Sequence, residues 1–212
     1  MTAKIKEIEN EIYINLKTPT CQQRRSVVIN EMKQLEMHQI GCFNCDGHCC
    51  SKQSNSMKIT PLEALELFLS LVNQEDKQDL NLLKEKLKKN ISEFRLDHEV
   101  YTGKKHNNSM RKTYDCPFFT SGNKGCSIRL ENKPYGCLSF NPKLINDNGS
   151  NCGLNEELFL AREQQYLEDE NRANKYLKDK LKIHWDKLEI PRALLFMIDL
   201  ALGTSPNLHD LE

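Results

Sequence analysis

The chain has 212 residues, and its 30 Lys and Arg residues balance 30 Asp and Glu residues, so its formal net charge at pH 7 is zero. A chain of this length can bury one sizeable core, and we expect a single, mostly α-helical domain over residues 1–212. The zero net charge argues against attraction of the whole molecule to nucleic acid, so no nucleic-acid partner is expected.

Neither export nor membrane insertion is expected. The N-terminal stretch mixes Lys with Glu and lacks the uninterrupted apolar run of a signal peptide. The longest apolar run, at 193–202, contains Asp199 and is much shorter than the roughly 20 residues that a membrane-spanning helix needs. We therefore expect a soluble, cytoplasmic protein.

The first two predicted elements precede the cysteine-rich region. Apolar residues near the N-terminus fit either a helical step or the alternation of a strand, and the pattern leaves both open. They are Ile5, Ile8, Ile12, Ile14 and Leu16. The segment 21–40 is predicted to be an amphipathic helix, because Val28, Met32 and Leu35 step by four and three. Cys21 is most simply a residue on the face of this helix.

A helix start is predicted at Thr60. Thr60 suits the N-cap, Pro61 suits the first helical position, and Glu63 can complete a capping box. This helix should end near Asn73. The following segment places Leu80, Leu83, Leu87, Ile91 and Phe94 on one face. Four lysines outside that face are expected to be solvated, namely Lys84, Lys86, Lys88 and Lys89.

Helical spacing is lost over 101–150, where Gly, Asn, Pro and Ser predominate. A loop of this length inside a domain needs its own organising agent. Helix is expected again from Asn155, which can cap the first turn. The apolar pattern that follows is Leu160, Leu167, Tyr176, Leu177, Leu181 and Trp185. Pro191 is expected to open a last apolar helix that ends at Gly203.

Eight of the nine cysteines form two blocks, both in segments without a clear secondary-structure pattern. The first block is Cys42, Cys45, Cys49 and Cys50, and the second is Cys116, Cys126, Cys137 and Cys152. Disulfides are rare in the cytoplasm and the cysteine count is odd, so metal ligation is the leading explanation. Thiolates are soft ligands that suit zinc and iron–sulfur clusters.

The spacing of the first block favours a two-metal or polynuclear arrangement. Adjacent side chains diverge by about 100° on a helix and point to opposite faces of a strand. Cys49 and Cys50 therefore either serve different ions, or only one of them is a ligand. A structural zinc site can contribute ~10 to 16 kcal/mol of folding free energy, more than the ~5 to 15 kcal/mol net stability of a typical domain. One such site could organise the middle region.

Two other side chains near the cysteines each allow two interpretations, one as part of the metal site and one without a role there. His48 is either a ligand or a solvent-exposed side chain, and Glu63 either faces the metal or only closes the capping box, which explains it fully. Arg111, Tyr114 and Asp115 are candidates for hydrogen bonds that orient the ligands.

Five short segments occur in a recognisable order. They read CFNCDGHCC at 42–50, TPLE at 60–63, CPFF at 116–119, GCSI at 125–128 and KPYGC at 133–137. In this order they resemble the YkgJ-like cysteine-cluster family, marked by CxxCxxxCC and described as zinc- or iron-chelating proteins. The resemblance covers residues 41–141 and implies metal binding. The flagellin lysine methylases, a longer group with a similar cysteine pattern, are thought to combine an iron–sulfur cluster with S-adenosylmethionine.

We therefore expect two cysteine-rich loops that fold over one or two metal centres, with the C-terminal helices packed against the earlier ones. Zinc is favoured over an iron–sulfur cluster, because the spacings match no familiar cluster template. A structural or stored metal would have every coordination position filled by protein, whereas a catalytic one would keep a position open beside a pocket. We favour a structural or stored metal over a catalytic one. The sequence does not identify a protein partner or substrate.

Overall fold

The computed structural model describes residues 3–38, 47–73, 79–98, 112–120, 125–142 and 152–204, and these are mostly helical, as predicted. The α-helices are α1 (Ala3–Asn10), α2 (Cys21–Met37), α3 (Pro61–Val72), α4 (Leu80–Glu93), α5 (Tyr135–Leu138), α6 (Glu156–Leu181) and α7 (Ile190–Leu202). A π-helical turn, η1 (Glu11–Asn15), extends α1, and two 3-10 turns lie near the cysteines, η2 (His48–Cys50) and η3 (Leu130–Asn132).

Two short antiparallel strand pairs join distant parts of the chain. β1 (Lys58–Ile59) pairs with β4 (Leu188–Glu189), and β2 (Phe140–Pro142) pairs with β3 (Cys152–Leu154). The sequence pattern predicted neither pair. Tyr135–Leu138 is also a helix within the segment that was expected to lack helical spacing.

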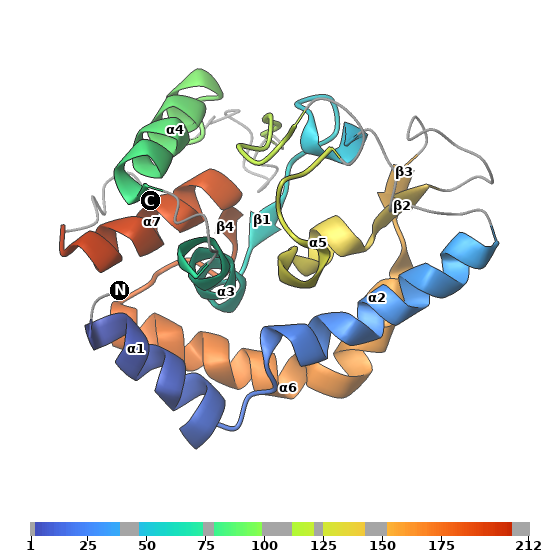
Figure 1. Cartoon of the computed structure of the whole chain (residues 1–212), viewed down its shortest axis with the longest axis horizontal. Helices are drawn as coiled ribbons and strands as arrows, with labels where there is room; N and C mark the ends of the chain where they lie inside the picture. Colours follow the sequence, from blue (N-terminus) through green and yellow to red (C-terminus); the bar gives the residue numbers. More distant parts are fainter. Residues whose placement is uncertain are drawn as a thin grey trace, which may run out of the picture.

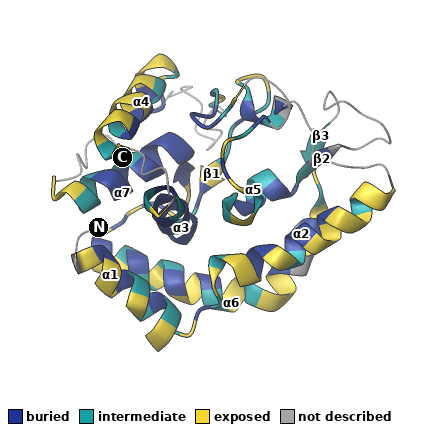
Figure 2. Ribbon diagram, in the orientation of Figure 1, coloured by how far each residue is buried: buried dark blue, intermediate teal, exposed yellow. Residues whose placement is uncertain are grey.

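Helix α3 lies near the middle of the molecule, with α4 and α7 on one side and α1 and α6 on the other (Figure 1). It contacts both α6 and α7, and almost all of its side chains are buried (Figure 2). The core around it includes Leu65, Phe68, Leu177, Leu194 and Met197. Helix α2 packs against α6 and exposes its outer face (Figures 1 and 2). The predicted packing of the C-terminal helices on the earlier ones is confirmed.

The N-terminal segment is helical rather than extended. Ile5, Ile8 and Ile12 are fully buried in the main core, whereas Ile14 is 66% exposed. The helical step therefore describes this segment, and the alternation that included Ile14 does not.

The predicted capping box at the start of α3 is confirmed. The Thr60 hydroxyl accepts a hydrogen bond from the Glu63 backbone N–H at 3.3 Å, and Glu63 Oε2 accepts one from the Thr60 N–H at 2.9 Å. Pro61 occupies the first turn, and Asn73 is the C-cap. Two donors that the helix cannot satisfy internally are thus paired.

Thr60→Ala should lower the free energy of unfolding by about 1 kcal/mol, because it leaves one of these N–H groups without its acceptor. Urea denaturation followed by circular dichroism measures the change. Thr60→Ser keeps the hydroxyl and should stay close to the parent protein. Equal losses in the two variants would contradict a role for the cap.

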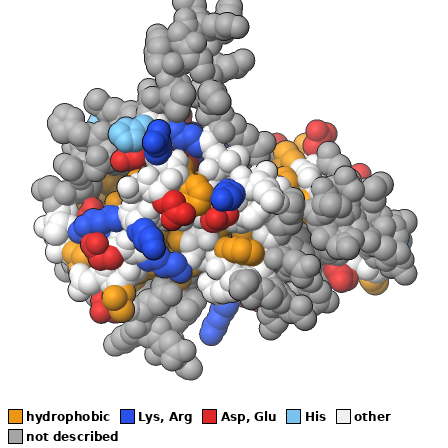
Figure 3. Space-filling model, turned by 90° about the horizontal axis from the view of Figure 1, so that it is seen from above, with side chains coloured by type: hydrophobic (Ala, Val, Ile, Leu, Met, Phe, Trp, Pro, Cys, Tyr) orange, Lys and Arg blue, Asp and Glu red, His pale blue; other side chains and the backbone are white. Residues whose placement is uncertain are grey.

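Helix α4 buries Leu83, Leu87 and Ile91, as its pattern predicts. Lys84 was expected to be solvated, but it forms an ion pair instead: its Nζ lies 2.6 Å from a carboxylate oxygen of Asp199 on α7. The lysines that are exposed are Lys86, Lys88 and Lys89. On the face seen in Figure 3, basic and acidic side chains are interspersed.

Helix α6 begins with the predicted cap, since Asn155 Oδ1 accepts from the N–H groups of Glu157 and Leu158 at 3.0 and 3.5 Å. The apolar pattern was expected to continue to Trp185, but the helix ends before it because Lys182 adopts a left-handed conformation. Trp185 is buried beyond the helix end. Two apolar residues of the pattern are exposed, Leu160 and Leu167.

Helix α7 has Pro191 in its first turn and ends at Gly203, whose φ of 72° is readily adopted by glycine, as predicted. The helix is strongly apolar, although it carries Asp199. No helix among the described residues combines the length and apolarity that crossing a membrane requires.

Candidate metal centre

Backbone hydrogen bonds join the two cysteine blocks. The Cys116 N–H donates to the Cys50 carbonyl at 2.7 Å, and the Cys50 N–H donates to the carbonyl of Gly47, the residue before turn η2, also at 2.7 Å. The first-block loop and the segments that carry the second block therefore lie side by side, although a long stretch of chain separates them. They meet above α5 in the view of Figure 1.

A small reversal of the chain then brings Cys126 back beside Cys116. Phe119 and Cys126 form an antiparallel bridge, and the Ser127 N–H donates to the Phe118 carbonyl at 2.9 Å. Gly47 packs directly against this reversal with a φ of 80°, and a Cβ there would lie 2.6 Å from the Cα of Gly125. Glycine at Gly47 thus allows the two blocks to approach closely.

Five thiols converge in this region: Cys49, Cys50, Cys116, Cys126 and Cys137. The pKa of Cys50 is raised, chiefly through hydrogen bonds with the thiols of Cys116 and Cys126. Burial raises the pKa of Cys137, and its neighbours Cys49 and Cys126 raise it further. Cys50 and Cys137 are therefore neutral thiols at neutral pH.

The five thiols line a cavity of about 400 Å³. Arg129 and Lys133 contribute positive charge to its wall, and Ile128, Leu130 and Ile190 contribute apolar surface. Basic groups next to thiols favour the thiolate form that binds metals. Neither Arg129 nor Lys133 shows a charge pattern that distinguishes it from a surface residue, so their place beside the thiols was not predicted.

The remaining predicted ligands are placed differently. Cys152 lines a neighbouring cavity together with Cys49 and Cys137, and it does not line the first one. Cys42 and Cys45 lie outside the described residues, as does the side chain of His48. In the described ranges, no three Cys, His, Asp or Glu side chains are already grouped as ligands of a metal ion.

The side chains of Tyr114 and Asp115 bond the backbone that follows the first block, at Met57 and Lys52, rather than the thiols. The Tyr114 hydroxyl donates to the Met57 carbonyl at 2.5 Å, and burial raises its pKa well above the ordinary value. A carboxylate oxygen of Asp115 accepts from the Lys52 N–H at 2.5 Å, two residues after Cys50. Arg111, the third residue predicted to orient ligands, lies outside the described residues.

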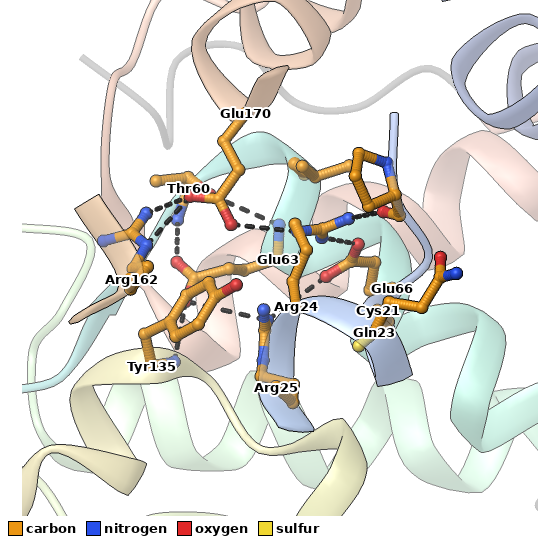
Figure 4. Close-up of polar contacts among 12 residues, drawn as sticks. Cys21, Gln23, Arg24, Arg25, Thr60, Glu63, Glu66, Tyr135, Arg162 and Glu170 are labelled. Atoms are coloured by element: carbon orange, nitrogen blue, oxygen red, sulfur yellow. Dashed lines mark hydrogen bonds and ion pairs between the residues drawn. The ribbon is translucent and has the colours of Figure 1, made fainter. Parts of the chain in front are cut away.

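A buried ionic cluster joins α2, α3 and α6 (Figure 4). It consists of Arg24, Arg25, Glu63, Glu66, Arg162 and Glu170, all of them buried. Arg24 Nε lies 2.9 Å from Glu170, Arg25 Nη2 lies 3.2 Å from Glu66, and Arg24 also pairs with Glu66. Three positive and three negative charges therefore balance inside the protein.

The cluster also holds the segment that carries Cys137. Arg25 Nε donates to the Lys133 carbonyl at 2.8 Å, and Glu63 Oε1 accepts from the Tyr135 N–H at 2.9 Å. The Arg25 guanidinium lies over the Tyr135 ring, 3.7 Å from its centroid. Glu63 thus has a second structural role beyond its cap, and both of its oxygens are engaged by backbone donors.

This cluster was not predicted from the sequence, although one signal for it was present. Arg25 shares the helical face of Val28 and Met32, at steps of three and four, so a charge stood in an apolar stripe. Glu66 likewise stands among leucines in the most apolar part of α3. A charged residue at a core position predicts a buried partner.

Comparison of the chain with protein-family models, with curated proteins and with solved structures gives no match.

Proposed function

We propose that the protein binds metal through the thiolates of its two cysteine blocks. The bound metal is either zinc or the iron of an iron–sulfur cluster. One observation carries the proposal: thiols from the first block meet three thiols from the second in one cavity. Cysteines used only as small core residues have no reason to gather from distant segments. The resemblance of the cysteine pattern to the YkgJ-like family supports the same reading.

The proposed ligands are the five gathered thiols together with Cys42, Cys45 and Cys152. Thiols must lose their protons to bind a metal, so binding should release protons and draw the sulfur atoms closer together. Cys49 lines both cavities, whereas its neighbour Cys50 lines only the first. This difference supports separate roles for the adjacent pair, and hence two ions or a polynuclear centre.

Zinc in a closed, structural site is the favoured form, because cysteine-only sites of this kind suit zinc and hold loops together. A catalytic centre is the second candidate, and the cavity of about 400 Å³ beside the thiols favours it. A catalytic metal needs an open coordination position next to such a space. Redox or group-transfer chemistry, such as lysine methylation of a protein, would then be the activity to seek.

Anaerobic purification followed by elemental analysis and an absorption spectrum tests the proposal. Colourless protein with about two zinc atoms per chain is the result expected of closed four-cysteine sites. Brown protein that contains iron and acid-labile sulfide would favour the catalytic alternative. Protein that stays metal-free after reconstitution with zinc, and with iron and sulfide, would contradict metal binding altogether.

A further inference from the structure

A second and larger cavity lies on the other side of Cys49 and Cys137. It has a volume of about 680 Å³ and is walled by the segment 53–60, by α5, by β3 and by Arg162 of α6. Cavities of roughly 300 to 1,000 Å³ are typical of small-molecule sites. Because the walls come from paired strands and packed helices, the space is held open by the fold itself.

The charged side chains in its lining are mostly basic: Lys58, Arg162 and Lys187. Lys58 is half exposed, and its Nζ lies 3.2 Å from Glu189. Lys187 is exposed, and none of the described acidic side chains forms an ion pair with it. Lys58 belongs to β1 and Lys187 directly precedes β4. Because these two strands pair, both lysines belong to the same two-stranded sheet or its edge.

The acidic side chain in the lining, Glu63, opposes this charge weakly. Its two carboxylate oxygens accept the N–H groups of Thr60 and Tyr135, and Arg25 lies 3.9 Å away. Arg162, in contrast, is fixed in the wall, because Glu170 binds its Nε at 2.9 Å. The cavity therefore has a surplus of positive charge and a rigid polar wall, which favours an anionic occupant.

We infer that this cavity binds a small organic anion with a carboxylate or phosphate group. The anionic group lies at Lys58 and Lys187, and the far end of the molecule reaches Cys49 and Cys137. Cys49 and Cys137 line both cavities and form a thiol wall between them. A molecule bound in the second cavity would therefore touch two ligands of the proposed metal centre. The inference goes beyond the proposed function, because the basic side chains of this cavity are not among the proposed metal ligands.

Isothermal titration calorimetry at low ionic strength tests the inference. The probes are succinate as a carboxylate that chelates metal weakly, phenyl phosphate as a phosphate, and glucose as a neutral molecule. One or both anions should bind, and glucose should not. Lys187→Gln should weaken anion binding about tenfold, equivalent to about 1.4 kcal/mol.

Two further variants separate this site from general attraction of anions. Lys86→Gln removes an exposed lysine on α4 and should leave anion binding unchanged. Ser56→Phe places a large ring in the cavity wall without changing charge, and it should abolish binding while circular dichroism shows an intact fold. Failure of both anions to bind, or equal binding by the parent, Lys187→Gln and Ser56→Phe proteins, would overturn the inference.

Metal content measured on the same samples keeps the two proposals apart. Full metal content without anion binding would refute only the second cavity as an anion site. Anion binding by protein that cannot be loaded with metal would refute only the proposed metal centre. The ratio of the succinate and phenyl phosphate affinities indicates which anionic group the site prefers.

Discussion

Cys116→Ser is expected to remove most of the metal from the purified protein and to lower its melting temperature. Cys116 is buried beside Cys50, and its own N–H ties its segment to the first block. A serine hydroxyl cannot replace a soft thiolate ligand. Losing a hydrogen-bond partner of a ligand typically costs 10- to 100-fold in metal affinity, and losing the ligand itself should cost more than about 100-fold. Elemental analysis and competition with a chelator measure the change.

Cys21→Ser is the matched control, because it makes the same atomic change at a thiol outside both blocks. The Cys21 thiol donates to the Glu131 carbonyl at 3.4 Å, a contact that a hydroxyl can reproduce. Burial raises the pKa of Cys21 to about 12, so it is a neutral thiol at pH 7. This variant should keep its full metal content. Loss of metal from both variants, or from neither, would be incompatible with ligation by the two blocks.

Features that depend on a few neighbouring residues were predictable from the sequence. The Thr60 and Glu63 capping box, the Asn155 cap and the Gly203 terminus each follow from local chemistry, and all three are present. The apolar face of α4 follows from periodicity alone. These signals work because their partners are within one or two helical turns.

Features that depend on distant partners were not predictable. The strand pairs contain only two or three residues each, which is too short for an alternating pattern to stand out. Trp185 keeps the apolar spacing of α6, but the left-handed Lys182 ends the helix before it, and no glycine marks that position. The N-terminal isoleucines fitted two periods equally, and only packing against the core decides between them.

The candidate site was predictable as a set of residue types rather than as a geometry. The density of cysteines identified both blocks, and five of the eight proposed ligands meet in the described structure. Their convergence depends on Gly47 and on the reversal at Phe119 and Cys126, which single-sequence patterns do not reveal. The basic and ionic groups around the thiols were missed because a charged residue is usually assigned to the surface.

Glu66→Ala is expected to have the largest effect on stability of any substitution at the ionic cluster. It leaves Arg24 and Arg25 buried without their shared carboxylate, and breaking a buried ion pair in this way typically costs about 3 to 5 kcal/mol. Urea denaturation measures the loss. Glu85→Ala removes a carboxylate from an exposed pair with Lys88 on α4 and should cost less than about 0.5 kcal/mol.

Acid should reduce the difference between the parent protein and Glu66→Gln. Burial opposes ionisation of Glu66, but Arg24 and Arg25 outweigh burial and lower the pKa of this carboxyl below its ordinary value. A lowered folded-state pKa contributes stability above the unfolded-state pKa, and this contribution is lost as the pH falls through the folded-state pKa. The two proteins should therefore differ most near neutral pH and converge in acid. A difference that does not change with pH would mean that the charge on Glu66 is not what stabilises the fold.

The same cluster should control the exposure of Cys137, because Arg25 and Glu63 hold the backbone on either side of Tyr135. In metal-free protein, Glu66→Ala should therefore speed the reaction of Cys137 with a neutral thiol reagent. The reaction of Cys116, a buried thiol whose backbone N–H is held by Cys50 rather than by the ionic cluster, serves as the internal reference. Peptide mapping after a timed reaction gives both rates. Equal acceleration at both cysteines would indicate general unfolding, whereas selective acceleration at Cys137 would show that the buried charges position the thiol wall between the two cavities.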